Sequence, residues 1–201
     1  MSVNWPVALN IAKEAKKRTN AFIVFGGPHP TIFAPEVVSE EAVDAVVVGD
    51  GDLSFPGLLD NVEKGEEKKV DGAIYKSGGR LIDGRPSNRV RDIDKLPVPD
   101  RRRLPFLDAY ITGMATQYLF GYKALTVAAS RGCPYNCSYC QPALREIHGE
   151  TVRVRTAKNV IDEMEYLKNN YNIEAIWFVD DTFTFNKKWA LPGLACDFSL
   201  N

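Results

Sequence analysis

Short apolar runs that end in glycine alternate with amphipathic segments over the first third of the chain, and this alternation restricts the fold more than any other feature. Residues 22–25 (Phe-Ile-Val-Phe) and 45–48 (Ala-Val-Val-Val) are such runs, and glycine follows each of them directly. The runs predict buried strands. Helical spacing of apolar residues predicts helices over 6–18, 35–41 and 55–63. Helix, strand, helix, strand, helix is the order of a parallel α/β sheet.

The predicted pattern changes after residue 72. Strands at 73–75 and 80–82 flank Ser77-Gly78-Gly79, which predicts a β-hairpin. Residues 85–105 are rich in proline and charge, and they predict an extended linker. Its arginine triplet, Arg101 to Arg103, is more typical of a solvated or ion-paired stretch than of an anion site. One βαβ unit follows, formed by strand 124–129, helix 157–170 and strand 175–179.

The composition excludes several classes of protein. The chain has 201 residues, of which 45% are hydrophobic, so wholesale disorder is excluded. The 25 Lys and Arg residues nearly balance the 26 Asp and Glu residues, which gives no electrostatic case for nucleic acid or an anionic membrane. No apolar run approaches the ~20 residues of a membrane span. The first ten residues lack a secretory pattern, so we expect a cytoplasmic protein.

Three of the four cysteines lie within eight residues, at Cys133, Cys137 and Cys140. Crowded thiols in an intracellular chain indicate a metal site rather than a disulfide framework. Thiolates suit iron–sulfur clusters, zinc or copper(I). A cluster usually has four cysteine ligands, so three would leave one iron open to a small molecule. Zinc remains an alternative, with His148 as a candidate fourth ligand.

The run from Cys133 to Cys140, with the aromatic Tyr139 before its last cysteine, resembles the radical S-adenosylmethionine (SAM) signature, C-x₃-C-x-aromatic-C. Other segments resemble the subclass of radical SAM proteins that carries a B12-binding domain, the Fe–S oxidoreductases. These segments are Gly26-Gly27-Pro28-His29-Pro30, Val48-Gly49-Asp50-Gly51-Asp52, Leu96-Pro97-Val98-Pro99-Asp100-Arg101 and Phe178-Val179-Asp180-Asp181-Thr182-Phe183.

The resemblance implies that Cys133, Cys137 and Cys140 hold a [4Fe–4S] cluster, and that SAM binds its fourth iron. One electron would then cleave SAM to a 5′-deoxyadenosyl radical. In the subclass, cobalamin often takes part in methyl transfer to the substrate. The implied partners are a small-molecule substrate and a reductant such as ferredoxin or flavodoxin, and the cofactors supply the difficult chemistry.

Further residues are assigned to SAM by the same resemblance. Tyr139 is expected to line the cofactor. Asp180 and Asp181 follow a strand and are expected near the SAM amino group; a helix cap or a solvated turn is the alternative. Arg155, together with Arg153, suits the methionine carboxylate. An exposed extended edge is the alternative for these arginines.

Gly26 and Gly27 end a strand at a usual position for ligands in open α/β sheets. The resemblance implies that their backbone approaches the nucleotide tail of cobalamin, since glycine has no side chain. A tight turn is the alternative explanation. His29 is expected to be a loop residue rather than a cobalt ligand.

The resemblance implies an α/β fold in three regions. Residues 1–68 would form a partial, doubly wound sheet of the cobalamin-binding type, and 69–122 a hairpin and linker. Residues 123–201 would form the first βα units of an incomplete radical SAM barrel. The D-x-H-x-x-G and S-x-L elements of the family are missing, and Leu191-Pro192-Gly193 should break the last helix. We therefore expect a fragment, truncated at both ends and inactive alone, in which cobalamin binding is doubtful. A non-catalytic iron–sulfur or zinc module and a cobalamin-independent enzyme are the alternatives.

Overall fold

The computed structural model describes residues 2–111, 122–140 and 143–194. The chain divides into two compact units. The first comprises Met1–Arg91 and Tyr135–Glu150, and the second comprises Asp92–Pro134 and Thr151–Asn201. Both units combine helices with strands, so the predicted α/β class is confirmed. Within the described residues, no helix is both long and apolar enough to span a membrane.

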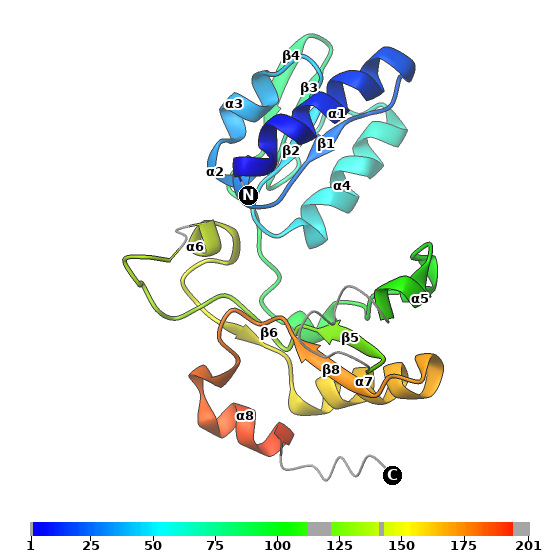
Figure 1. Ribbon diagram of the computed structural model, residues 1–201. Coiled ribbons are helices and arrows are strands. Elements are labelled where there is room, and N and C mark those ends of the chain that lie inside the picture. Colours follow the sequence, from blue (N-terminus) through cyan, green and yellow to red (C-terminus); the bar gives the residue numbers. More distant parts are fainter. Residues whose placement is uncertain (1, 112–121, 141–142, 195–201) are drawn as a thin grey trace. The chain divides into compact units, whose positions relative to one another are not determined.

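The first unit contains a four-stranded mixed sheet in the order β1-β2-β3-β4 (Figure 1). Strands β1 and β2 are parallel, whereas β2 with β3 and β3 with β4 are antiparallel. The apolar runs therefore form strands as predicted, but the sheet is not parallel throughout. Its strands are β1 (Val24–Phe25), β2 (Ala45–Val47), β3 (Ala73–Ser77) and β4 (Arg80–Asp83).

The predicted hairpin is confirmed and belongs to this sheet. Gly78 and Gly79 form its two-residue turn with φ of 54° and 75°, as the mirror-image turn of a tight hairpin requires. Strand β3 pairs with β2 along its other edge, in the register Val46 to Ile74. The hairpin therefore extends the first sheet, whereas the sequence assigns it to the connecting region 69–122.

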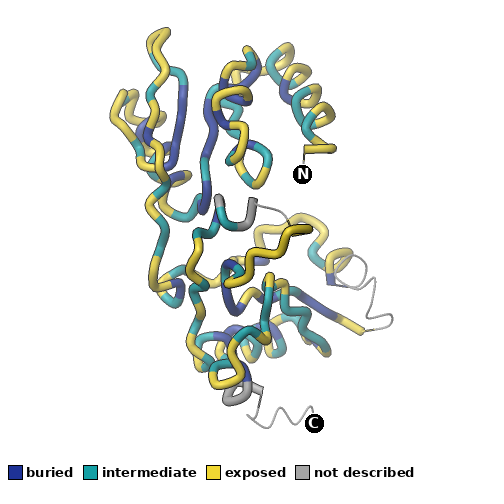
Figure 2. The backbone as a smooth tube through the Cα atoms, turned by 90° about the vertical axis from the view of Figure 1, so that its left-hand side faces the viewer, coloured by how far each residue is buried: buried dark blue, intermediate teal, exposed yellow. Residues whose placement is uncertain are grey.

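Helices cover both faces of the sheet because alternate residues of a strand point to opposite faces. Val46 and Ile74 pack into one cluster with residues of α1 and α3, and Ala45, Val47 and Tyr75 pack into another with Leu58 of α4. Figure 2 shows the resulting buried stretches in dark blue. The helices of this unit are η1 (Ser2–Asn4), α1 (Trp5–Arg18), α2 (Pro28–Ile32), α3 (Ala34–Ser39), α4 (Gly51–Lys64) and α6 (Ala143–His148).

The second unit contains the predicted βαβ arrangement. Strand β5 (Ala124–Val127) runs parallel to β8 (Ala175–Phe178), and α7 (Ala157–Tyr171) connects them. Leu125, Val127, Val160 and Leu167 form the core between helix and strands. Thr156 caps α7 by accepting from the Asn159 N–H. The remaining elements are η2 (Ile93–Lys95), η3 (Arg101–Arg103), α5 (Leu107–Ala109), β6 (Ser130–Arg131), β7 (Arg153–Val154), η5 (Phe183–Phe185) and α8 (Lys187–Leu194).

Two short elements correct the sequence predictions. Helix α6 lies in the segment after the cysteines, for which the sequence predicts only a long loop. Helix α8 runs from Lys187 to Leu194, so Leu191-Pro192-Gly193 does not break it. Eight residues make few i to i−4 hydrogen bonds, so the proline removes only one of a small number.

Candidate cofactor site

The described cysteines are free thiols with different accessibility. Cys133 is half-buried, while Cys137 and Cys140 are exposed, and none of the three forms a disulfide. Cys133 falls in the second unit, and Cys137 and Cys140 fall in the first. The Cys140 N–H donates to the Cys137 carbonyl at 3.0 Å, which makes a tight turn between these two cysteines. Cys196 lies outside the described residues.

The chemistry of this donor set fits an iron–sulfur cluster. Three unpaired thiols at C-x₃-C-x₂-C spacing offer the soft ligands that such clusters use. Tyr139 is 89% exposed, and a hydrogen bond with the Cys137 side chain raises the pKa of its hydroxyl. Among the described residues, no group of three His, Cys, Asp or Glu side chains is already assembled to hold a metal ion.

The backbone that leads from β5 towards the first cysteine is fixed by charged side chains; we call residues 126–130 the strand exit. Asp180 accepts from the Ala129 N–H at 3.1 Å and from the Ser130 hydroxyl at 2.5 Å. Both of its carboxylate oxygens therefore hold the strand exit. Asp181 is exposed in the following turn. The predicted role of these two carboxylates towards SAM remains a prediction.

Arg155 contacts the strand exit from the other side. Its guanidinium donates to the Ala128 carbonyl at 3.0 Å, to the Asn159 side chain at 2.6 Å and to Glu163 at 2.5 Å. Arg153 lies in β7, which pairs with β6, whereas Arg155 follows this strand and its side chain is half-buried. The Arg155 guanidinium is thus engaged within the second unit, and its predicted contact with the SAM carboxylate remains a prediction.

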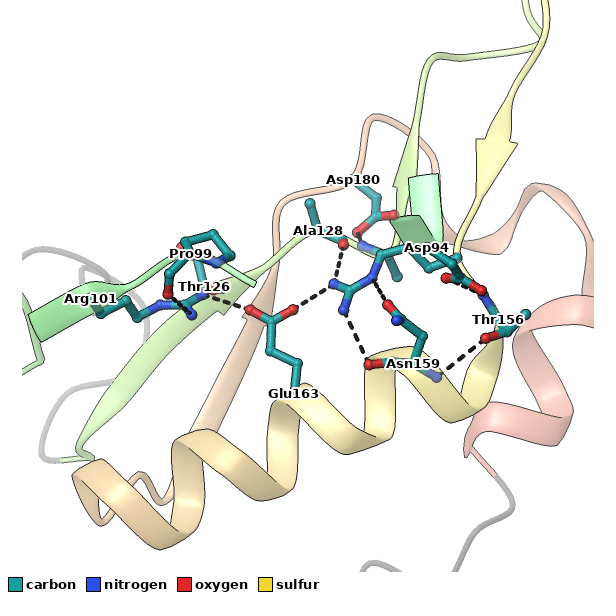
Figure 3. A network of polar contacts seen from close by, with 11 residues as sticks. Asp94, Pro99, Arg101, Thr126, Ala128, Thr156, Asn159, Glu163 and Asp180 are labelled. Atoms are coloured by element: carbon teal, nitrogen blue, oxygen red, sulfur yellow. Dashed lines mark hydrogen bonds and ion pairs between the residues drawn. The ribbon is translucent and has the colours of Figure 1, made fainter. Parts of the chain in front are cut away.

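Glu163 is shared by two arginines, the buried Arg101 and the half-buried Arg155 (Figure 3). It is 3% exposed, and its other carboxylate oxygen accepts from Arg101 at 2.9 Å. Arg101 also donates to the Thr126 carbonyl at 2.9 Å. The carboxylate therefore forms ion pairs with two cations that each bind a carbonyl of the strand exit. Sequence reasoning missed Glu163, although it lies three residues after Val160 on the apolar side of the predicted helix.

The arginine triplet divides between the interior and the surface. Arg101 is buried, whereas Arg102 and Arg103 form exposed ion pairs with Asp100. Hydrogen bonds from the Arg102 guanidinium lower the pKa of the Asp100 carboxyl. The interpretation of the triplet as an ion-paired stretch is confirmed.

Gly26 and Gly27 lie between β1 and α2 in the first unit. Gly27 has a φ of +90°, which L side chains rarely adopt, and a Cβ there would meet no atom within 4 Å. A Cβ at Gly26 would make only ordinary contact with the Val47 carbonyl at 3.6 Å. Gly27 thus serves the turn into α2, and cobalamin contact by this pair remains a prediction.

Both histidines lie in short helices, which corrects the prediction that His29 is a loop residue. His29 lies in α2 rather than in a loop, where its ring stacks between Trp5 and Phe33 and burial lowers its pKa. His148 ends α6, with Nδ1 2.9 Å from Asp50 Oδ1. Within the described part of the chain, His148 joins no trio of metal-ligating side chains.

The pair of Asp50 and His148 anchors α6 to the start of α4, and Arg89 also holds α6 by donating to the Ile147 carbonyl at 2.9 Å. Asp50→Ala should weaken this anchoring by about 1–2 kcal/mol, because it removes a buried charged acceptor. Hydrogen exchange of residues 143–150 should become about tenfold faster. The control is Asp60→Ala on the exposed face of α4. Unchanged exchange in Asp50→Ala would refute the anchoring.

Comparison with known proteins identifies relatives over most of the chain. No protein-family model matches it. It is 40% identical over 188 residues to "Uncharacterized methyltransferase PH0819" of Pyrococcus horikoshii, covering 92% of this chain and 39% of that protein. It is 27% identical to the anaerobic magnesium-protoporphyrin IX monomethyl ester cyclase of Synechocystis, covering 84% of this chain and 32% of that protein. The chain spans well under half the length of these relatives.

The fold is shared with a solved radical SAM enzyme. The methyltransferase TsrM from Kitasatospora setae aligns with a TM-score of 0.68 at 20% identity, over 93% of this chain and 35% of that one. The chain is thus similar in sequence to proteins that include methyltransferases, and in fold to a radical SAM methyltransferase. The resemblance that the cysteine motif predicts is therefore confirmed.

Proposed function

We propose that the chain supplies the cluster-binding and SAM-binding part of a radical SAM protein. Cys133, Cys137 and Cys140 would hold a [4Fe–4S] cluster and leave one iron for SAM. When bound, these cofactors supply one-electron cleavage of SAM to a 5′-deoxyadenosyl radical. The observation that carries the proposal is the set of three free thiols at C-x₃-C-x-aromatic-C spacing in a chain with such relatives.

The roles of the protein's own residues follow from their positions. Asp180, Arg155 and Arg101 bind different residues of the strand exit, so the backbone leading to Cys133 is ordered in advance. A ligand that is already positioned loses less entropy when it binds. Tyr139 is free to cover a bound cofactor, because its ring is exposed beside Cys137 and Cys140.

The finer architecture belongs to the same proposal. The sheet of the first unit would be part of a doubly wound, cobalamin-binding domain, and β5, α7 and β8 would begin a partial TIM barrel. A solved structure of TsrM, at a TM-score of 0.66, contains cobalamin and a [4Fe–4S] cluster. Cobalamin would bind near Gly26 and Gly27, at the carboxyl end of β1. Methyl transfer to a small molecule, with electrons from a ferredoxin or flavodoxin, is the reaction class proposed.

Anaerobic reconstitution of the chain with iron and sulfide tests the proposal. We expect about four iron and four sulfide per chain and the broad visible absorption of a cluster. Cys137→Ala should lose the cluster, whereas Cys196→Ala, outside the motif, should retain it. Stoichiometric zinc without a cluster would refute the radical SAM assignment. The loaded protein should then form 5′-deoxyadenosine from SAM after reduction, and retention of added cobalamin separates a cobalamin-dependent protein from a cobalamin-independent one.

A further inference from the structure

A threonine hydroxyl lies against the first cysteine of the motif. Thr182 Oγ1 is 3.2 Å from Cys133 Sγ, and either atom can donate in this contact. Both residues belong to the second unit, and both are half-buried. The other two cysteines are exposed. The sulfur of Cys133 is therefore contacted by a polar side chain from the turn that follows β8.

The turn that carries Thr182 is fixed on both sides. Before it, the Val179 N–H donates to the Val127 carbonyl at 3.1 Å, and Asp180 holds Ala129 and Ser130. After it, the Phe183 ring packs on Phe178 with ring centroids 4.6 Å apart. The hydroxyl is thus held beside the sulfur by the fold, without any bound ligand.

The direction of this hydrogen bond changes with the state of the sulfur. A thiol can donate, but a metal-bound thiolate has no proton and can only accept. Thr182 must then donate to Cys133. Reduction adds negative charge to a cluster and its sulfurs, and hydrogen bonds to those sulfurs stabilise the added charge. The hydroxyl therefore favours the reduced form.

We propose that Thr182 is a positioning residue of the cluster site, whose hydroxyl donates to the Cys133 sulfur and raises the reduction potential. The inference rests on the proposed function and adds to it a residue that controls how readily the cluster is reduced. Sequence reasoning did not single out Thr182, although it directly follows Asp180-Asp181 in the segment that resembles the family.

The test is an anaerobic redox titration of the reconstituted chain, followed by electron paramagnetic resonance of the reduced cluster. Thr182→Val keeps the shape of the side chain and removes the donor. We expect the reduced-to-oxidised ratio at a fixed potential to fall about tenfold, which equals about 59 mV for one electron. Thr182→Ser keeps a hydroxyl and should restore most of the potential. Thr184→Val is the matched control, since Thr184 is exposed in the same segment.

The outcomes separate this inference from the proposed function. A loaded Thr182→Val protein with the wild-type potential overturns the role of Thr182 alone. So does a Thr182→Ser protein with a potential as low as that of the valine variant. Wild-type protein that takes up no cluster overturns the proposed function and this inference with it. Circular dichroism and iron content of each variant establish that the potentials compare folded, loaded proteins.

Discussion

Glu163→Ala should destabilise the second unit by about 3–5 kcal/mol, the cost of leaving buried charges without their partner. Glu163 is 3% exposed and contacts Arg101 at 2.9 Å and Arg155 at 2.5 Å. Without the carboxylate, the guanidinium groups of Arg101 and Arg155 lose the counter-ion that they share. Neither can turn to solvent without releasing a carbonyl of the strand exit.

Urea unfolding followed by tryptophan fluorescence measures this loss, because Trp177 and Trp189 both belong to the second unit. Glu165→Ala is the matched control: it lies two residues further along α7 and is exposed, so its substitution should change stability by less than about 0.5 kcal/mol. The loss of stability in Glu163→Gln should lie between those of the two alanine variants, since glutamine keeps the shape of the side chain but not its charge. Equal midpoints for the two alanine variants would contradict the structural role of the buried carboxylate.

Gly84→Ala should destabilise the first unit by about 3 kcal/mol or more. The added Cβ would overlap backbone atoms, which cannot move aside as a flexible side chain can. Gly84 follows β4, and a Cβ there would overlap the Val70 carbonyl oxygen and lie 2.9 Å from the Ala73 carbonyl oxygen. Both are backbone atoms. The same glycine donates to Ala73 and accepts from Gly72, each at 2.8 Å, so it cannot move away without breaking the hairpin's hydrogen bonds.

Gly51→Ala is the control for this substitution. Gly51 begins α4, and a Cβ there would meet its nearest neighbour, Val47 Cγ1, at an ordinary 3.6 Å. Alanine is also a better helix former than glycine, so this variant should be as stable as the wild type or more so. Thermal unfolding monitored by circular dichroism compares the two. Equal melting temperatures for the Gly84→Ala and Gly51→Ala proteins would contradict this prediction. They would show that the backbone around Val70 shifts at little cost in free energy.

Local pattern was enough to predict the elements that bury one continuous apolar surface. The strands at 45–47 and 175–178 lie in continuous apolar runs, and the helix at 157–171 follows the helical spacing of apolar residues. The hairpin follows from two adjacent glycines. In each case the residues within the element are sufficient to specify it. Strand pairing is not specified in this local way, because the strand with which β3 pairs depends on where β2 lies in space. The mixed sheet was therefore not predictable from spacing alone.

The cysteines of the candidate site could be found by spacing, but the side chains that support them could not. Glu163 and Arg155 are eight residues apart, and Arg101, the other partner of Glu163, is 62 residues from it. Thr182 meets Cys133 across 49 residues. Such contacts are set by tertiary packing, to which a single sequence gives no direct access. Asp180 shows the same limit: its position after a strand was read correctly, while its contacts to Ala129 and Ser130 required the fold.

The buried Arg101–Glu163–Arg155 group restricts how this chain can evolve. Loss of Glu163 leaves two cations without their counter-ion, and loss of either arginine removes its bonds to Glu163 and to a carbonyl of the strand exit. Replacing such a group as a whole by well-packed apolar side chains is nevertheless often neutral or stabilising. Sequences with the complete group and sequences with an apolar replacement are thus separated by less stable single substitutions. The three positions should therefore vary together among related chains, and a change at one should predict changes at the other two. Thr126 and Ala128 are bound through their carbonyls, so their side chains should vary independently of that group.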